Sequence, residues 1–214
     1  SKGHAAPVVY AALAERGIFS TELLPTLRQY GSILQGHPDM NKIPGVDMST
    51  GSLGQGLSVA NGIAVAAKIG GEDYRTYVLM GDGELQEGQI WEAIMFAAGK
   101  KVDNLIATID YNGQQIDGAT DDVMPLGNLR AKFEAFGWDV LEIKEGNSVA
   151  AILEGMKVAK TRIGKGKPVC VLLHTVMGNG VDFMMHTHAW HGKAPNDEQL
   201  AIGLAQNAET LGDY

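Results

Sequence analysis

The residues with the clearest chemical potential are an aspartate and an asparagine that each follow a short apolar run. Asp82 lies in Gly81-Asp82-Gly83, and Asn112 comes thirty residues later along the chain. One strand–helix–strand unit fits between them, so we expect Asp82 and Asn112 at neighbouring strand ends. A carboxylate, an amide oxygen and a nearby backbone carbonyl are hard ligands. Together with two phosphate oxygens and a water, they would surround Mg²⁺ or Ca²⁺.

The glycines beside Asp82 would let a phosphate approach the backbone closely. The competing interpretation is structural: Asp82 would cap the next helix, and Asn112 would form a turn. The Gly-Asp-Gly run alone does not separate the two interpretations. The position of Asn112, one strand–helix–strand unit further on, favours the metal–phosphate site.

Three histidines near the end of the chain offer a different metal site. His186, His188 and His191 lie within six residues, and three imidazoles could bind Zn²⁺. The sequence disfavours zinc, because it has one cysteine, Cys170, and no His-Glu-x-x-His motif. We expect His186 and His188 to be secondary, and Cys170 to be buried in a strand without a catalytic role.

The elements that would position these residues alternate along the chain. Short aliphatic runs are typical of buried parallel strands, and amphipathic stretches are typical of helices. The predicted strands are 77–80, 105–110, 139–143 and 168–176. The predicted helices are 6–16, 53–69, 89–98, 129–136 with Asn128 as N-cap, 149–162, and a terminal helix within 196–214. This alternation predicts an α/β fold, a mostly parallel sheet with helices on both faces and ligands at the carboxyl ends of its strands.

Composition excludes several classes of function. The chain has 214 residues, of which 45% are hydrophobic and 20% charged, and a formal net charge of −8. It can therefore bury a core, and its acidic balance argues against nucleic acid or an anionic membrane surface as a partner. No apolar stretch approaches the ~20 residues of a membrane span. A single cysteine excludes a disulfide framework and fits a reducing, cytoplasmic compartment.

Longer strings extend the Gly-Asp-Gly signal into a family resemblance. They cover nearly the whole chain: SKGHAAPVVYA from Ser1, QGHPDM from Gln35, STGSLGQGLS from Ser49, GDGELQEGQIWEA from Gly81, DYNGQQIDG from Asp110 and HAWHG from His188. These strings resemble transketolases, and the Gly-Asp-Gly and Asn pair resembles the metal motif of the thiamine diphosphate-binding fold. The chain is similar to the N-terminal, thiamine diphosphate-binding subunit of a split, two-subunit transketolase.

The resemblance implies thiamine diphosphate as the cofactor, held through Mg²⁺, for which Ca²⁺ or Mn²⁺ would substitute. Asp82, Asn112 and the backbone carbonyl of Gln114 would be the metal ligands, and Asp110 would support their loop. The cofactor-binding residues implied by the resemblance are His4, Gly51, Leu53, Gly81, Asp82, Gly83, Glu87, Asn112, Gln114, Met177 and His191. From the residues alone, the glycine-rich turn at 51–54 could equally serve packing, and Met177 could be a core filler.

The resemblance also implies four catalytic residues. His4 and His191 would contact the diphosphate and the oxygen at the reacting carbon, and His37 would hydrogen-bond the donor hydroxyls. Glu87 and Glu92 match buried glutamates that link two active sites across a dimer interface. From the residues alone, a lone histidine is more often a core or surface residue, and the two glutamates would be a solvated helix face.

The implied activity is transfer of a two-carbon ketol unit from a ketose phosphate to an aldose phosphate, as in the pentose phosphate pathway. Residues 1–214 would form one diphosphate-binding domain, and the family's segment before its SxGH motif would be missing ahead of Ser1. The family's cofactor-activating glutamate lies in a pyrimidine-binding domain. We therefore expect a C-terminal partner subunit within a heterotetramer, with 56–67 and 87–96 as contact surfaces.

Three alternatives stay open on the sequence. A related thiamine diphosphate enzyme, such as 1-deoxyxylulose-5-phosphate synthase or a transketolase specialised for another sugar phosphate, would share the site. QEGQIWEA and HAWHG favour a transketolase without fixing its sugar. A scaffold subunit would keep the fold without the chemistry, although Asp82, Asn112 and the histidines argue against that loss. A plain sugar-phosphate-binding module would bind its ligand without a metal.

Overall fold

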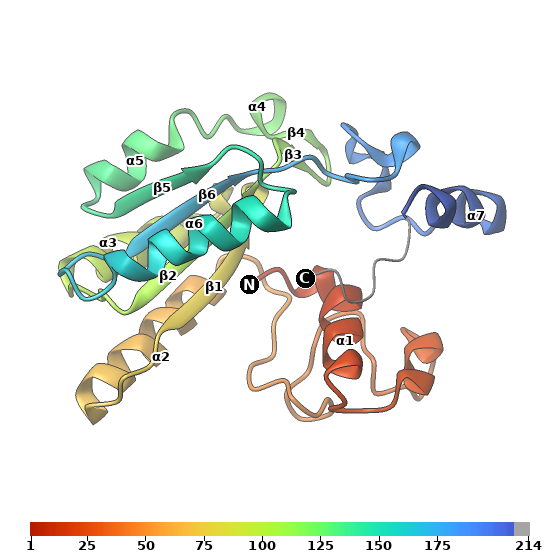
Figure 1. The fold of residues 1–214 in the computed structure, drawn as a ribbon, viewed down its shortest axis with the longest axis horizontal. Helices are drawn as coiled ribbons and strands as arrows, with labels where there is room; N and C mark the ends of the chain where they lie inside the picture. Colours follow the sequence, from red (N-terminus) through yellow and green to blue (C-terminus); the bar gives the residue numbers. More distant parts are fainter. Residues whose placement is uncertain (208–214) are drawn as a thin grey trace.

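A four-stranded parallel sheet forms the centre of the computed structural model, which describes residues 1–207 (Figure 1). The sheet order is β1 (Thr76–Gly81), β2 (Leu105–Tyr111), β6 (Val169–His174) and β5 (Asp139–Ile143). All three neighbouring pairs are parallel. The predicted α/β fold is confirmed, and each predicted strand matches an observed strand to within two residues at either end.

At β6, helices cover both faces of the sheet. Val171 and Leu173 belong to a buried cluster under helix α6, whereas Cys170 and Leu172 belong to a larger cluster under α2, α3 and α5. Successive strand side chains point to opposite faces, so an uninterrupted apolar run is what burial on both faces requires. The four helices are α2 (Gly56–Gly70), α3 (Gly88–Gly99), α5 (Leu129–Ala135) and α6 (Val149–Arg162).

Side-chain caps fix where several helices begin. The amide oxygen of Asn128 accepts a hydrogen bond from the backbone N–H of Ala131 over 3.0 Å, as the predicted N-cap of α5 should. The Ser148 hydroxyl accepts from the N–H of Ala151 at the start of α6. Asn196 forms a capping box at the start of α7 (Asp197–Gln206). The predicted terminal helix is thus observed, and 208–214 lie outside the described residues.

The predicted start of the second helix is wrong by three residues. The sequence predicted a helix from 53, but α2 begins at Gly56. Gly54 has φ +86°, in the left-handed region that a right-handed helix excludes. The chain therefore turns at Leu53 and Gly54 before the helix begins, and this turn borders the site described below.

A small N-terminal unit packs beside the carboxyl ends of the strands (Figure 1). It comprises η1 (Gly3–Ala5), α1 (Ala6–Glu15), η2 (Thr21–Thr26) and the irregular segment up to α2. Tyr10, Leu34 and Ile43 are buried in its own core. The Tyr10 hydroxyl donates to the carbonyl of Gln35 over 2.8 Å, which holds the loop carrying His37 against α1.

Short elements complete the end of the sheet where the strands finish. They are η3 (Gly83–Gln86), β3 (Gln114–Gln115), β4 (Gly118–Ala119), α4 (Thr120–Val123), η4 (Asp182–Met184) and η5 (His188–Trp190). The segment from η4 to α7 leaves the sheet after β6 and lies at the same end as the N-terminal unit (Figure 1). Among the helices of residues 1–207, none is both long and apolar enough to cross a membrane.

Candidate functional site

A cavity of about 460 Å³ lies at the carboxyl ends of β1 and β2. Its lining includes every residue that the sequence predicted to bind the cofactor, hold the metal or act in catalysis: His4, His37, Gly51, Leu53, Gly81, Asp82, Gly83, Glu87, Asn112, Gln114, Met177 and His191. These residues come from segments up to 187 positions apart in the chain. The structure therefore brings the predicted set together, while the role of each residue stays a prediction.

Asp82 and Asn112 lie at neighbouring strand ends, because β1 pairs with β2 through Gly81 opposite Asp110. The Asp82 carboxylate is held from two sides. Its Oδ1 accepts the N–H of Gly83 over 2.8 Å, and its Oδ2 accepts the N–H of Gly113 over 2.6 Å. These contacts point the carboxylate across the gap between the two strands, where it lines the cavity.

The structural interpretation of both residues is also realised. The Asp82 side chain caps η3, and the amide oxygen of Asn112 accepts the N–H of Gln114 over 2.9 Å in a turn. Neither bond exhausts the oxygen involved, since a carboxylate or amide oxygen has two lone pairs. Capping and metal binding are therefore compatible: the caps hold the oxygens in place, and their free lone pairs remain for a cation.

Electrostatics set Asp82 apart from the other acids of the cavity. The residue is 1% exposed, and burial raises the pKa of its carboxyl to about 6, with a smaller push from the charge of Asp110, against the N–H groups of Gly113 and Gly83. A buried carboxylate that is costly to ionise would gain from a divalent cation beside it. The carboxylate, amide and carbonyl oxygens fit Mg²⁺ or Ca²⁺.

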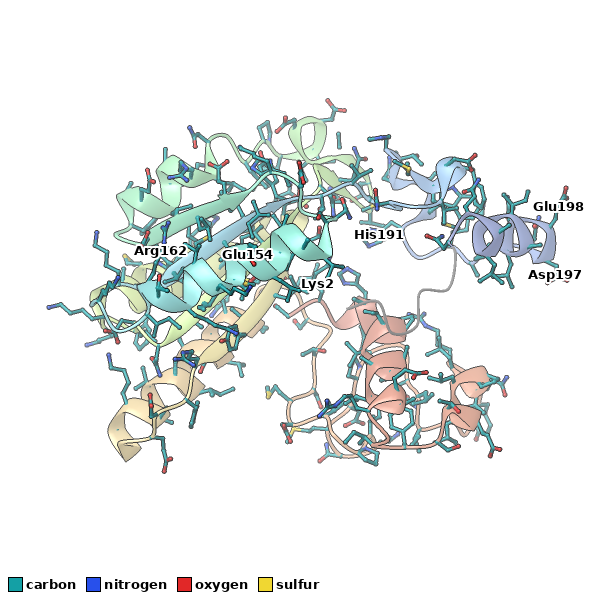
Figure 2. The ribbon with its side chains drawn as sticks, in the orientation of Figure 1. Lys2, Glu154, Arg162, His191, Asp197 and Glu198 are labelled. Atoms are coloured by element: carbon teal, nitrogen blue, oxygen red, sulfur yellow. The ribbon has the colours of Figure 1, made fainter. Side chains whose placement is uncertain are left out.

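Two of the three histidines that line the cavity are direct neighbours. The ring centroids of His4 and His191 lie 5.2 Å apart. Burial lowers the pKa of both imidazoles, and the charges of His191 and Lys2 lower that of His4 further. Both rings are therefore neutral at neutral pH, and each can donate one hydrogen bond and accept another. Figure 2 labels His191 and Lys2 where the C-terminal segment and the N-terminal unit approach the strand ends.

The third histidine is positioned by a glycine. Gly51 has φ +137°, and a Cβ atom there would lie 2.9 Å from Cγ of His37. Only glycine lets the backbone come this close to the His37 ring at this φ. The glycine-rich turn therefore has a local packing role, and the same absence of side chains keeps the cavity open beside Leu53.

The two predicted glutamates and two histidines of the C-terminal cluster lie at the surface of the single chain. Glu87 lines the cavity at the start of α3, but Glu87 and Glu92 are exposed in the single chain rather than buried. His186 and His188 are also exposed. In the part of the chain that the structure describes, no group of three or more histidine, cysteine, aspartate or glutamate side chains could hold a metal.

Sequence reasoning missed three charged residues of the cavity, Lys2, Glu84 and Asp117. Glu84 is 2% exposed; its carboxylate accepts from the N–H of Gly54 over 2.9 Å and from the Ser1 hydroxyl. Lys2 forms an ion pair with Asp110. The position of Glu84 could have indicated its role, because it lies between Gly-Asp-Gly and the apolar Leu85. A carboxylate buried at such a position needs hydrogen-bond donors around it. Nothing local in the sequence indicates the partner of Lys2.

Comparison with known proteins decides the family. A family model described as transketolase, thiamine diphosphate binding domain, matches residues 1–208. The chain belongs to the transketolase family. Within that family it corresponds to the domain that binds thiamine diphosphate, so the resemblance drawn from the motifs is confirmed.

Relatives of this transketolase domain include both separate subunits and full-length enzymes. A 6-deoxy-6-sulfo-D-fructose transketolase subunit of Clostridium sp. (strain MSTE9) is 45% identical over 96% of this chain and 74% of its own length. An apulose-4-phosphate transketolase subunit of Phocaeicola vulgatus is 43% identical over 99% and 74%. Human transketolase is 41% identical over 96% of this chain, but over only 32% of its own length. The chain thus covers about three quarters of the length of the Clostridium and Phocaeicola subunits.

Solved transketolase structures share the fold. The enzyme of Campylobacter jejuni superposes with a TM-score of 0.86 at 33% identity, covering 96% of this chain and 33% of that enzyme. A Pichia stipitis transketolase variant in complex with xylulose 5-phosphate gives a TM-score of 0.82 at 34% identity, over 88% and 29%. The fold of this chain is therefore that of the thiamine diphosphate-binding part of transketolases.

Proposed function

We propose that this chain binds thiamine diphosphate through a divalent cation and supplies the diphosphate-binding half of a transketolase. The complete enzyme transfers a two-carbon ketol unit from a ketose phosphate to an aldose phosphate, in the cytoplasm. The proposal depends above all on one observation: Asp82 and Asn112 lie at adjacent strand ends beside a cavity that His4, His37 and His191 also line.

The cation would be Mg²⁺, with Ca²⁺ or Mn²⁺ as substitutes. Asp82, Asn112 and the carbonyl of Gln114 would hold it, and the diphosphate would add further oxygens. Because the carboxylate is already fixed by the N–H groups of Gly83 and Gly113, little conformational freedom would be lost on binding. The glycines beside Asp82 leave the backbone accessible to phosphate oxygens.

Bound thiamine diphosphate supplies a carbon nucleophile and an electron sink for breaking a carbon–carbon bond beside a carbonyl. The chain's own residues would position groups and move protons. Neutral His4 and His191 would donate hydrogen bonds to the oxygen at the reacting carbon and exchange a proton with it. His37 would hydrogen-bond the donor hydroxyls, while Gly51, Leu53 and Met177 would shape the cofactor's seat.

A partner chain is part of the proposal. The relatives that match over most of their length are named as subunits, and we infer a C-terminal subunit that carries the pyrimidine-binding domain. Self-association would cover the face of α2 and α3. A second cavity of about 370 Å³ lies between these helices and is lined in part by Asn61, Glu92 and Phe96. The apolar side chains of Phe96, on α3, and Ile63, on α2, are exposed. Glu87 and Glu92 would become buried in such a heterotetramer.

Reconstitution tests the proposed reaction. The purified chain, its candidate partner, and the mixture are each supplied with thiamine diphosphate, Mg²⁺, a ketose phosphate donor and an aldose phosphate acceptor. Turnover only in the mixture, and none when the chain carries Asp82→Ala, is the expected result. Turnover by the chain alone would contradict the need for a partner, and turnover unaffected by Asp82→Ala would contradict the metal site.

A specialised sugar is the second candidate function, because two relatives at 45% and 43% identity are named for modified sugars. The same reconstituted pair, offered a series of donors and acceptors, identifies the substrate by the acceptor consumed. A pair that joins pyruvate to glyceraldehyde 3-phosphate would instead be a 1-deoxyxylulose-5-phosphate synthase. A scaffold subunit would bind no thiamine diphosphate, and a plain sugar-phosphate module would bind its ligand equally well without metal.

A further inference from the structure

We propose that Lys2 is a positioning residue of this cofactor site and that it acts through Asp110; this inference rests on the proposed function. The Lys2 ammonium donates to Oδ2 of Asp110, and the Thr175 hydroxyl donates to Oδ1. The side chains of Lys2 and Asp110 are 17% and 23% exposed. Both carboxylate oxygens of Asp110 are therefore occupied by groups of this chain, in a setting shielded from most of the solvent.

The Asp110 carboxylate joins three segments that each supply a residue to the cavity. Lys2 precedes η1, which carries His4. Asp110 lies near the end of β2, two positions before Asn112, and Thr175 follows β6, two positions before Met177. One carboxylate thus fixes the N-terminal unit, the metal-loop strand and the β6 exit against one another. Lys2 supplies the connection to the N-terminal unit.

The path of the Lys2 side chain strengthens this interpretation. Its Cε atom lies 3.6 Å from where a Cβ on Gly81 would stand, so the side chain crosses the end of β1 to reach β2. The backbone carbonyl of Asp110 also accepts the N–H of Asp82 over 3.1 Å. A shift of Asp110 would therefore be transmitted to Asp82 through the backbone.

Charge explains why a lysine is needed at this place. Within the described residues, Lys2 is the one lysine or arginine that lines the cavity, whereas Asp82, Glu84, Glu87 and Asp117 line it as acids. The carboxylate of Asp110, the partner of Lys2, belongs to the neighbouring strand end opposite Gly81. Without the ammonium, Asp110 and Asp82 would repel each other across neighbouring strand ends, and a partly buried carboxylate would lose its cation.

A double-mutant cycle separates action through Asp110 from direct contact with the cofactor. The dissociation constant of thiamine diphosphate at fixed Mg²⁺ is measured by calorimetry for the wild type, Lys2→Met, Asp110→Asn and the double variant. Met keeps most of the aliphatic stem and removes the charge. We expect Lys2→Met to weaken binding about tenfold, and the double variant to bind no more weakly than the weaker single variant.

Two further variants control for charge and for unspecific effects. Lys2→Arg keeps the cation and should bind within about threefold of the wild type, because an arginine also pairs with a carboxylate. Lys100→Met removes an exposed charge at the end of α3 and should change nothing. Urea unfolding of every variant without cofactor shows whether an effect on binding comes from the site or from loss of the fold.

Two results would overturn the role of Lys2. Wild-type affinity in Lys2→Met would show that the ion pair positions nothing. A double variant weakened by the product of the two single effects would show that Lys2 contacts the cofactor independently of Asp110. If the wild type itself binds no thiamine diphosphate, the proposed function fails instead. The ion pair is then tested by the unfolding cycle, where purely additive effects on the unfolding equilibrium constant would refute it.

Discussion

The backbone N–H of Asp82 donates to the carbonyl of Asp110 over 3.1 Å, so two acids stand side by side on neighbouring strand ends. Their carboxylates have different partners. Asp110 is paired with Lys2, whereas the ion pairs within residues 1–207 leave Asp82 without a cation. A buried carboxylate with hydrogen-bond donors but no cation is well placed to bind a divalent metal ion.

Replacing Asp82 by Asn should abolish the Mg²⁺ dependence of thiamine diphosphate binding, because the charged ligand is lost while the volume is kept. Affinity measured with Mg²⁺ should fall to the value measured with EDTA. The matched control is Asp117→Asn, which removes an exposed acid from the same cavity and should keep the Mg²⁺ dependence. Equal losses in both variants would indicate that general negative charge, not Asp82, binds the metal.

The same substitution should stabilise the metal-free protein at neutral pH. The folded state raises the pKa of Asp82 to about 6 from its usual 3.8, so the stability contribution of this group is complete below pH 4 and is lost as pH rises through 6. Asparagine does not ionise, so Asp82→Asn avoids this loss of stability at high pH. It has only one side-chain oxygen, so one of the two backbone N–H groups of Gly83 and Gly113 loses its acceptor. We expect a net gain of about 1 kcal/mol in the free energy of unfolding at pH 8. Urea unfolding between pH 4 and 8 measures it; a difference between variants that does not grow with pH would refute this assignment.

Gly51→Ala should destabilise the protein by about 1–3 kcal/mol. A Cβ at this φ of +137° would press on the His37 ring, so His37 and the loop around it would have to move. The control is Gly62→Ala, since a Cβ at this helical position meets nothing within 4 Å, and alanine should stabilise α2 by up to about 1 kcal/mol. Urea unfolding compares the two variants, and a neutral Gly51→Ala would contradict the close approach described here.

Acid should weaken the fold through Glu142. Hydrogen bonds from Lys144, Arg130 and His174 lower the pKa of its carboxyl to about 2 from 4.5, so its contribution is present above pH 4.5 and is lost as pH falls towards 2. Glu142→Gln should cost on the order of 1 kcal/mol at pH 6 and less at pH 3. The control is Glu154→Gln, which loses an exposed pair with Lys157 and should cost less stability at pH 6 than Glu142→Gln. Urea unfolding at pH 6 and pH 3 measures both variants, and an effect of Glu142→Gln that does not shrink at pH 3 would contradict this assignment.

Phe96→Glu should weaken self-association, because it places a charge beside the cavity between α2 and α3. Leu153→Glu is the control: it changes a comparably exposed apolar residue on α6, on the opposite face of the sheet. Sedimentation velocity of the chain with its partner measures the assembly. We expect a smaller assembly with Phe96→Glu and an unchanged one with Leu153→Glu. Assemblies of equal size in the two variants would show that the face of α2 and α3 is not the interface.

Local sequence signals predicted the fold and most of the site. The strand runs carry apolar side chains on both faces, which identified the parallel sheet, and the pair Asp82 and Asn112 marked the strand ends. All the predicted site residues line one cavity, because motifs at strand ends and in the connecting loops converge on one edge of a parallel sheet.

Features that depend on local backbone conformation, or on residues far apart in the chain, could not be predicted from the sequence. The left-handed turn at Gly54 moved the start of α2, and the two-residue strands β3 and β4 are too short to show a periodicity. Lys2 and Asp110 lie 108 positions apart, so their pairing appears only in three dimensions. Glu87 and Glu92 are exposed in the single chain, and their burial remains part of the proposed self-association.

Binding of thiamine diphosphate is the most direct test of the central claim, a cofactor site built on a metal held by Asp82 and Asn112. Calorimetry would titrate thiamine diphosphate into the chain, alone and with its partner chain, each with Mg²⁺ and with EDTA. The account predicts binding that requires Mg²⁺ and disappears in Asp82→Ala. Binding that is equally tight in EDTA or in Asp82→Ala, or no binding even with the partner present, would contradict it.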